Sequence, residues 1–202
     1  MTQGGTPSPR RAWPATLARR ASLLALVLAA VGLTWWTRAF TRWPSTYYMT
    51  GPSMEPTIQP GEYFTVSSPV EELRRGMLVI FRFRHEDDST YHVLRRLAAL
   101  PGDTIAMQMG RAIVNGRPTE WPFRILEPRA RVSPLALVPD LYTWGPWVVP
   151  RDSVVLLSDT RDIVGWPDSR FLGFIPIDAL EAQAGRIIWS PHRRAAILRR
   201  LR

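Results

Sequence analysis

Residues 77–83 have the sequence MLVIFRF, and residues 91–94 have the sequence YHVL. Both stretches are rich in β-branched, aromatic and other apolar side chains, and a polar stretch separates them, which is typical of two strands joined by a loop. Similar short runs lie further out along the chain, at residues 64–66, 104–107, 112–114 and 154–157. The sequence therefore predicts a mainly β fold over most of its length.

Turn residues punctuate these runs. Asn115-Gly116 is typical of a hairpin turn or a strand end, and residues 101–103 (PGD) predict a tight turn. Residues 119–148 are rich in Pro and Trp without clear periodicity, which predicts a long excursion over the surface. The tail from His192 is basic, with apolar residues at helical spacing. It predicts either a solvated terminal helix or a contact with anionic lipid headgroups.

Composition limits the classes of function. The chain has 202 residues, room for one domain of ordinary size plus an appendage, and its 26 basic and 17 acidic residues give a net charge of +9. Cysteine is absent, which excludes disulfide scaffolds, thiolate metal sites and cysteine nucleophiles. Lysine is absent as well, so every basic residue apart from the histidines is arginine. The arginines do not alternate with aromatic residues on one patch, so nucleic acid is not expected as a partner.

An uncharged stretch near the N-terminus, residues 21–37, predicts a membrane segment. As a helix it would span roughly 26 Å, close to the bilayer core of about 30 Å. More arginines precede it than follow it, which favours a cytoplasmic N-terminus, residues 1–20, and an extracytoplasmic remainder. A secretory signal cleaved near residues 30–32 and a buried soluble helix are the alternatives. The flanking arginines are Arg10, Arg11, Arg19 and Arg20 before the stretch, and Arg38 and Arg42 after it.

One serine stands out as a candidate nucleophile. Residues 51–58 (GPSMEPTI) hold Ser53 between two prolines, beside Met54. This segment resembles the nucleophile box of type I signal peptidases (leader peptidases), and three further parts of the sequence resemble that family in the same order. Residues 75–81 resemble its first core strand. Residues 95–103 and 114–118 resemble the box that carries its base and the hairpin after it, and residues 158–162 and 168–176 resemble its last box.

The resemblance implies a membrane-anchored serine endopeptidase that removes signal peptides from exported preproteins after a small-x-small sequence, through an acyl-enzyme. Residues 45–190 would form a β-rich catalytic domain outside the cytoplasmic membrane, behind a single transmembrane helix and before a basic tail, residues 191–202. Ser53 would be the nucleophile, and backbone N–H groups at Gly51 and Ser53 would hold the oxyanion. The implied partners are signal peptides and membrane lipid, with no cofactor and no metal. The substrate would add as an extended strand along Met49, Met54, Val93 and Leu94.

One position departs from the family in a way that bears on catalysis. Bacterial members use a lysine as general base, and that position is Arg95 here. A guanidinium has a pKa of about 12.5–13.8 and no lone pair that can accept a proton, so Arg95 cannot be the base. The family also places a serine shortly before Asp168 to hold the lysine, and residues 163–167 (IVGWP) contain none.

Three hypotheses follow. His92 could act as the base, although its offset of three residues from Arg95 in a strand points it to the opposite face unless a bulge intervenes. The chain could instead be an inactive relative that binds apolar peptide segments or scaffolds a membrane partner, with Arg95 paired to Asp159 or Asp168. Thirdly, a base outside these boxes, or the substrate's own groups, could sustain slow cleavage.

Three further residues are candidates for support rather than for chemistry. Asp168 and Arg170 resemble a family ion pair that braces the active site. Asp159 could orient a base, or lie exposed in a loop.

Overall fold

The computed structural model describes residues 15–41, 45–85, 87–128, 131–133, 135–162, 168–194 and 197–201. The chain divides into two compact units, with the boundary between Trp43 and Pro44. Of the predicted cytoplasmic segment, residues 1–14 lie outside the described residues.

The described part of the first unit is the helix α1 (Ala15–Thr41), of 27 residues. The predicted membrane segment, residues 21–37, lies within it, and all of the described side chains, residues 23–36, are exposed. In the part of the chain that the structure describes, no helix combines the length and the apolar character that a membrane span requires.

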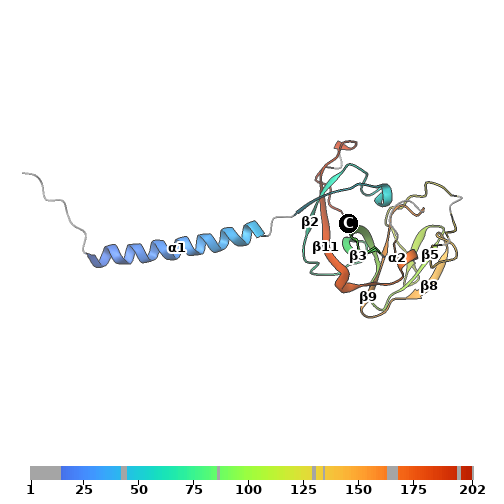
Figure 1. Cartoon of the computed structure of the whole chain (residues 1–202), viewed down its shortest axis with the longest axis horizontal. Helices are drawn as coiled ribbons and strands as arrows, with labels where there is room; N and C mark the ends of the chain where they lie inside the picture. Colours follow the sequence, from blue (N-terminus) through green and yellow to red (C-terminus); the bar gives the residue numbers. More distant parts are fainter. Residues whose placement is uncertain are drawn as a thin grey trace, which may run out of the picture. The chain divides into compact units, whose positions relative to one another are not determined.

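The second unit is built on a seven-stranded antiparallel sheet in the order β1-β2-β11-β3-β4-β9-β10 (Figure 1). The predicted strand at residues 77–83 is β3, which pairs with β4 so that Val79 lies opposite Arg95. The strands are β1 (Ser45–Tyr48), β2 (Tyr63–Ser67), β3 (Leu78–Arg84), β4 (Thr90–Ala99), β9 (Ser153–Leu157), β10 (Ile175–Pro176) and β11 (Leu180–Trp189).

The apolar run in β3 has a simple physical reason. Leu78 and Ile80 belong to one buried cluster, whereas Val79 and Phe81 belong to another. Alternate side chains of a strand point to opposite faces, so both faces of β3 are covered over residues 78–81, and a strand segment covered on both faces is continuously apolar.

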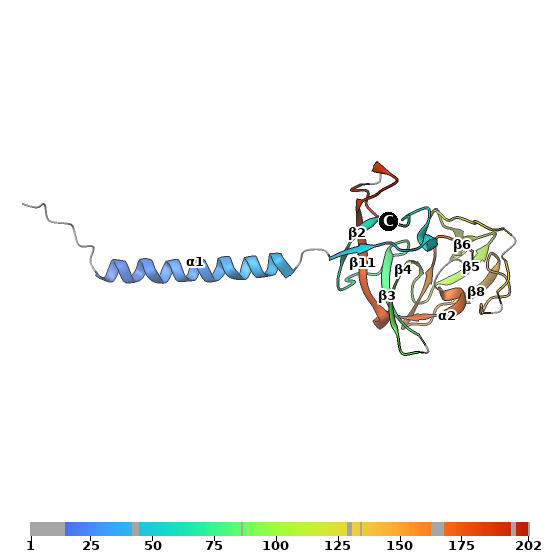
Figure 2. The same cartoon turned by 45° about the horizontal axis from the view of Figure 1, so that its top comes forward.

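A second sheet has four strands in the order β7-β6-β5-β8, and Figure 2 shows it at the other end of this unit from β2 and β11. Its strands are β5 (Thr104–Gln108), β6 (Arg111–Val114), β7 (Arg117–Pro118) and β8 (Trp144–Val148). The predicted hairpin turn is confirmed, because Asn115 and Gly116 join β6 to β7 with φ angles of 50° and 76°. The tight turn at residues 101–103 is confirmed as well, since the Asp103 amide donates to the Leu100 carbonyl.

The expectation for residues 119–148 is wrong in its second half. This segment contains β8, and it contributes Val138, Leu141, Tyr142 and Trp144 to the core of the four-stranded sheet. Its proline and glycine hide the strand from a pattern search, because β8 itself has the sequence WGPWV.

The expectation of a solvated terminal helix is also wrong for the described part of the tail. The amides of Leu198 and Leu201 donate to the carbonyls of Ile187 and Gly185, so residues 197–201 run alongside β11. Leu201 is buried in the same cluster as Leu78 and Ile80. The tail therefore adds Leu201 to a core, while residues 197–200 are exposed.

The described part of this unit also contains short helical elements. The 3₁₀ helix η1 (Pro52–Met54) carries Ser53, and helix α2 (Ser169–Leu172) follows Asp168. A further 3₁₀ turn, η2 (Ile177–Ala179), leads into β11.

Candidate active site

Ser53 lies on η1 and is held from behind by the last sequence box. The Thr160 amide donates to the Ser53 carbonyl at 3.0 Å, and the Thr160 hydroxyl donates to the Pro52 carbonyl at 2.6 Å. These hydrogen bonds join segments that lie far apart in the sequence. The turn that carries Ser53 is thereby fixed to the segment that follows β9.

Ser53 lines a cavity of about 230 Å³. Of the predicted oxyanion and groove residues, Gly51, Met49, Val93 and Leu94 line the same cavity. Met54 differs from the expectation, because its side chain is fully buried in the core cluster. The remaining lining residues are Tyr47, Tyr48, Thr50, Phe64, Ile80, Tyr91, His92 and Arg95.

Arg95 is buried at the floor of this cavity. Its Nη1 donates to Ser53 Oγ at 3.2 Å and to the Leu94 carbonyl at 2.6 Å. Burial lowers the pKa of Arg95 to about 10, while the charges of Asp168 and Asp159 oppose this shift and that of Arg170 adds to it. The side chain thus stays protonated at neutral pH. Since a guanidinium only donates, the Ser53 oxygen is the acceptor of their hydrogen bond.

His92 points to a different partner. Its Nδ1 lies 2.6 Å from Glu181 Oε2 on β11, and its side chain is about half exposed, at 48%. The register from Val79–Arg95 to Arg82–His92 is regular, and the bulge in β4 lies further along, between Leu97 and Ala99. The alternation that separates His92 from Arg95 is therefore preserved.

The ion pair expected for Arg95 involves its neighbour instead. Arg96 donates from Nε and Nη2 to the two carboxylate oxygens of Asp159 at 2.7 and 2.6 Å, and both side chains are fully buried. Arg96 also donates to Thr57 Oγ1 at 2.9 Å and to the Gly76 carbonyl at 2.6 Å. Asp159 is thus a buried partner of Arg96 rather than an exposed loop carboxylate.

The sequence contained a signal for this pair that the expectation for Arg95 overlooked. Two arginines stand side by side in a strand that is otherwise apolar toward its end, so at least one had to be buried. Buried charges are as a rule paired with an opposite charge, so a carboxylate partner for at least one of the two was to be expected.

The ion pair predicted between Asp168 and Arg170 is present. Arg170 donates from Nε and Nη2 to Asp168 at 3.0 and 2.8 Å, and the amide and hydroxyl of Ser158 donate to the same carboxylate at 2.9 and 2.7 Å. Burial by itself would raise the pKa of Asp168, but the Arg170 charge and these hydrogen bonds hold it below its usual value. Residues 163–167, where the family's supporting serine is missing from the sequence, lie outside the described residues.

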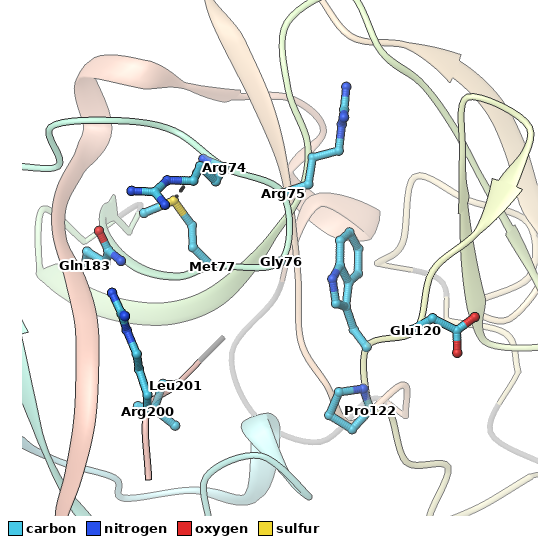
Figure 3. A pocket seen from close by; sticks show the side chains of 10 residues that line it. Arg74, Arg75, Gly76, Met77, Glu120, Pro122, Gln183, Arg200 and Leu201 are labelled. Carbon is cyan, nitrogen blue, oxygen red and sulfur yellow. Dashed lines mark hydrogen bonds between the residues drawn. The ribbon is translucent and has the colours of Figure 1, made fainter. Parts of the chain in front are cut away.

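A second cavity, of about 490 Å³, shares no lining residue with the first. Figure 3 shows Arg74, Gln183 and Arg200 on one side of it, with Glu120 and Pro122 on the other. Two of its arginines have carboxylate partners, since Arg74 pairs with the exposed Glu72 and Arg75 pairs with Asp103. The described residues that line it include no serine of the kind that Ser53 supplies to the first cavity.

Comparisons with known proteins agree with the sequence boxes. The family model described as "Signal peptidase, peptidase S26" matches residues 20–189. A signal peptidase I of Bacillus licheniformis is 31% identical over 145 residues, which cover 70% of this chain and 72% of that protein. One of Leptolyngbya laminosa is 30% identical over 154 residues, which cover 72% and 69%. The crystal structure of a signal peptidase I from Enterococcus faecalis V583 is 21% identical, with a TM-score of 0.40, and the match covers 57% of this chain and 98% of that one. The family model spans most of the chain, and the chain therefore belongs to the signal peptidase family, peptidase S26.

Proposed function

We propose that this chain is a membrane-bound serine endopeptidase that takes the small-x-small segment of an exported preprotein into the Ser53 cavity and cuts after it. The observation that carries the proposal is the position of Ser53, fixed by Thr160 in a cavity lined by Met49, Val93 and Leu94. These apolar walls suit short side chains of an extended peptide.

The chemistry would be acyl transfer. Ser53 Oγ would attack the scissile carbonyl, and the acyl-enzyme would then be hydrolysed. Arg95 cannot accept the Ser53 proton, but its charge would stabilise an alkoxide or an oxyanion beside it. The proton would have to leave to another acceptor. His92 could accept this proton only after its side chain has moved away from Glu181. A group of the substrate could accept the proton without any such rearrangement.

A second candidate function is favoured by the same contact between Arg95 and Ser53. In this alternative the cavity binds small-x-small segments without cutting them, or cuts them slowly, because a donor occupies the place of a base. Both functions use the same cavity and the same class of peptide.

Cleavage of a precursor with an Ala-x-Ala site separates the two. We would compare the detergent-solubilised wild type with Ser53→Ala, His92→Ala and Arg95→Lys. If the wild type cleaves the precursor and Ser53→Ala does not, the endopeptidase is supported. If His92→Ala also loses the wild-type activity, His92 is assigned as the base. Activity that appears only in Arg95→Lys supports the binding function. Equal cleavage by the wild type and Ser53→Ala contradicts the role of Ser53.

We also propose that residues 21–37 anchor the chain in the cytoplasmic membrane, with the N-terminus inside and residues 45–190 outside. Helix α1 would be about 40 Å long, more than the bilayer core of about 30 Å. The exposed rings of Tyr48, Tyr63 and Trp189 contact one another on β1, β2 and β11. Exposed Tyr and Trp are typical of surfaces that meet the lipid headgroups.

The absence of cysteine makes the topology testable. Single variants Ser8→Cys and Met109→Cys would be treated with a membrane-impermeant maleimide in intact cells or spheroplasts. Met109 is highly exposed, at 82%, so its replacement should react from outside, whereas Ser8→Cys should react only after lysis. Equal reaction of the two variants before lysis, or release of the protein by alkaline extraction, contradicts the anchor.

A further inference from the structure

The floor of the Ser53 cavity offers hydrogen-bond donors. Arg95 donates to the Ser53 oxygen, so the hydroxyl proton of Ser53 points elsewhere and is left for another acceptor. A ligand that reaches this floor therefore meets the N–H groups of a guanidinium and the O–H group of a serine. Such a set suits a ligand atom that accepts more than one hydrogen bond.

Buried charges of both signs lie around the cavity floor. Four arginines are buried around the cavity floor and behind it, Arg95, Arg96, Arg161 and Arg170. Three aspartates are buried among the described residues of this part of the domain, Asp159, Asp162 and Asp168, and the charges of Asp168, Arg170 and Asp159 act on Arg95.

The carboxylates of this region are already engaged. Arg96 holds Asp159 and Arg170 holds Asp168, each through two hydrogen bonds. Asp162 accepts from the Tyr142 hydroxyl and from the amides of Leu126 and Glu127. A ligand carboxylate that accepts hydrogen bonds from Arg95 and Ser53 would therefore leave the hydrogen bonds of these three carboxylates in place.

The cavity above this floor is suited to a peptide. Met49, Val93 and Leu94 line its walls, and Gly51 lines it beside Ser53. A chain end that lay along these walls would place its last carboxyl group, rather than a side chain, against Ser53 and Arg95.

We propose that this cavity recognises the free C-terminal carboxylate of a peptide that ends in a small-x-small sequence, with Arg95 and Ser53 as the donors to that carboxylate. Such a carboxylate is what hydrolysis after a small-x-small segment creates. The inference rests on the proposed function in one respect, that the cavity takes small-x-small segments. It adds that the cleaved form is preferred to the uncleaved one.

The physical reason for the preference is the charge of the ligand. An uncleaved peptide presents a neutral amide carbonyl to Arg95, whereas a cleaved one presents an anion. Arg95 is charged in both cases, but only the cleaved peptide adds an opposite charge and a second acceptor oxygen, so that its contact with Arg95 is an ion pair. The family's lysine, when neutral, accepts a proton from serine; the guanidinium of Arg95 instead holds an anion beside it.

The test compares two fluorescent peptides of identical sequence ending in Ala-Leu-Ala, one with a free carboxylate and one with a C-terminal amide. Binding to the full-length protein in detergent would be followed by fluorescence anisotropy. The acid should bind at least about tenfold more tightly than the amide. Arg95→Met should abolish this difference, and Ser53→Ala should reduce it. Arg74→Ala, which removes an arginine from the other cavity, is the matched control and should change neither affinity.

The outcomes separate this inference from the proposed function. Equal binding of acid and amide overturns the carboxylate inference but leaves the proposal that the cavity binds small-x-small segments. Binding of neither peptide overturns that proposal itself. A preference that persists in folded Arg95→Met also overturns the assignment. Should Arg95→Met fail to fold, competition in the wild type decides: N-acetylalanine should displace the acid peptide and N-acetylalaninamide should not, and equal displacement contradicts the inference.

Discussion

Arginines in two neighbouring regions of this protein have different partners. Behind the cavity, Arg96 and Arg170 each hold a buried aspartate through two hydrogen bonds. At the cavity floor, equally buried, Arg95 donates to the Ser53 hydroxyl and to a backbone carbonyl. Burial alone therefore does not define the role of an arginine. Arg96 and Arg170 stabilise the fold through these ion pairs, whereas Arg95 is the arginine that lies beside the candidate nucleophile.

The largest expected effect is in the region behind the cavity. Arg96→Met would leave Asp159 buried without its countercharge, which typically costs about 3–5 kcal/mol. We therefore expect a large fall in the free energy of unfolding, measured by urea denaturation in detergent. Arg82→Met, in the exposed second half of strand β3, is the matched control and should change stability by less than about 1 kcal/mol. Similar losses in the two variants would contradict the role assigned to Arg96.

The second effect is a loss of folding stability on acidification. Because folding lowers the pKa of Asp168, the folded state binds fewer protons than the unfolded state near the ordinary carboxyl pKa of about 3.9. Its contribution to stability is complete above that pKa and is lost as the pH falls toward the lower pKa of the folded state. Glu62 and Asp103, whose pKa values are also lowered, act in the same direction.

Melting temperature measured from pH 7 down to pH 3 tests this. Asp168→Asn should be less stable than the wild type at pH 7, and its melting temperature should fall less steeply with acid. Asp88→Asn, at an exposed position, should follow the wild-type curve. An unchanged slope in Asp168→Asn would show that Asp168 does not carry the acid sensitivity.

A smaller effect is expected where a carboxylate has partners other than arginine. Tyr142 donates its hydroxyl proton to the buried Asp162, and burial together with that carboxylate raises the pKa of Tyr142. Tyr142→Phe removes a hydrogen bond to a charged group, and such bonds contribute about 1.5–3 kcal/mol. The amides of Leu126 and Glu127 remain, so the loss should lie at the low end. Chemical denaturation measures this loss, with Tyr47→Phe, at a more exposed tyrosine, as the control. Equal stability of the two variants would contradict the prediction.

The smallest effect concerns the exposed pair of Arg74 and Glu72, whose side chains are 70% and 72% exposed. Exposed pairs contribute about 0–1 kcal/mol, and salt screens them. Glu72→Ala should therefore change the unfolding midpoint slightly at low salt and not at all at about 1 M salt. A loss of stability in Glu72→Ala comparable to that in Arg96→Met would contradict the expectation that exposed ion pairs contribute less than buried ones.

Local patterns allowed much of the fold to be predicted. The strands β2, β3, β4, β5, β6 and β9 all contain runs that were visible as clusters of apolar and β-branched residues. The Asn115-Gly116 turn followed from the backbone preferences of two residues. Strand β8 could not be predicted in this way, because its proline and glycine contradict strand propensity and only its packing against β5 makes it a strand.

The candidate site shows the same division. The family boxes, Ser53 and the arginine at the family's lysine position are properties of the sequence by itself, and so is the conclusion that no lysine can act as base, because the chain contains none. The tertiary structure decided that Arg96, rather than Arg95, pairs with Asp159, which lies 63 residues away, and that the tail runs beside β11 and buries Leu201 in a core. Local propensity depends only on residues that are close together in the sequence. The partner of a buried charge depends instead on which distant segments the sheet brings together.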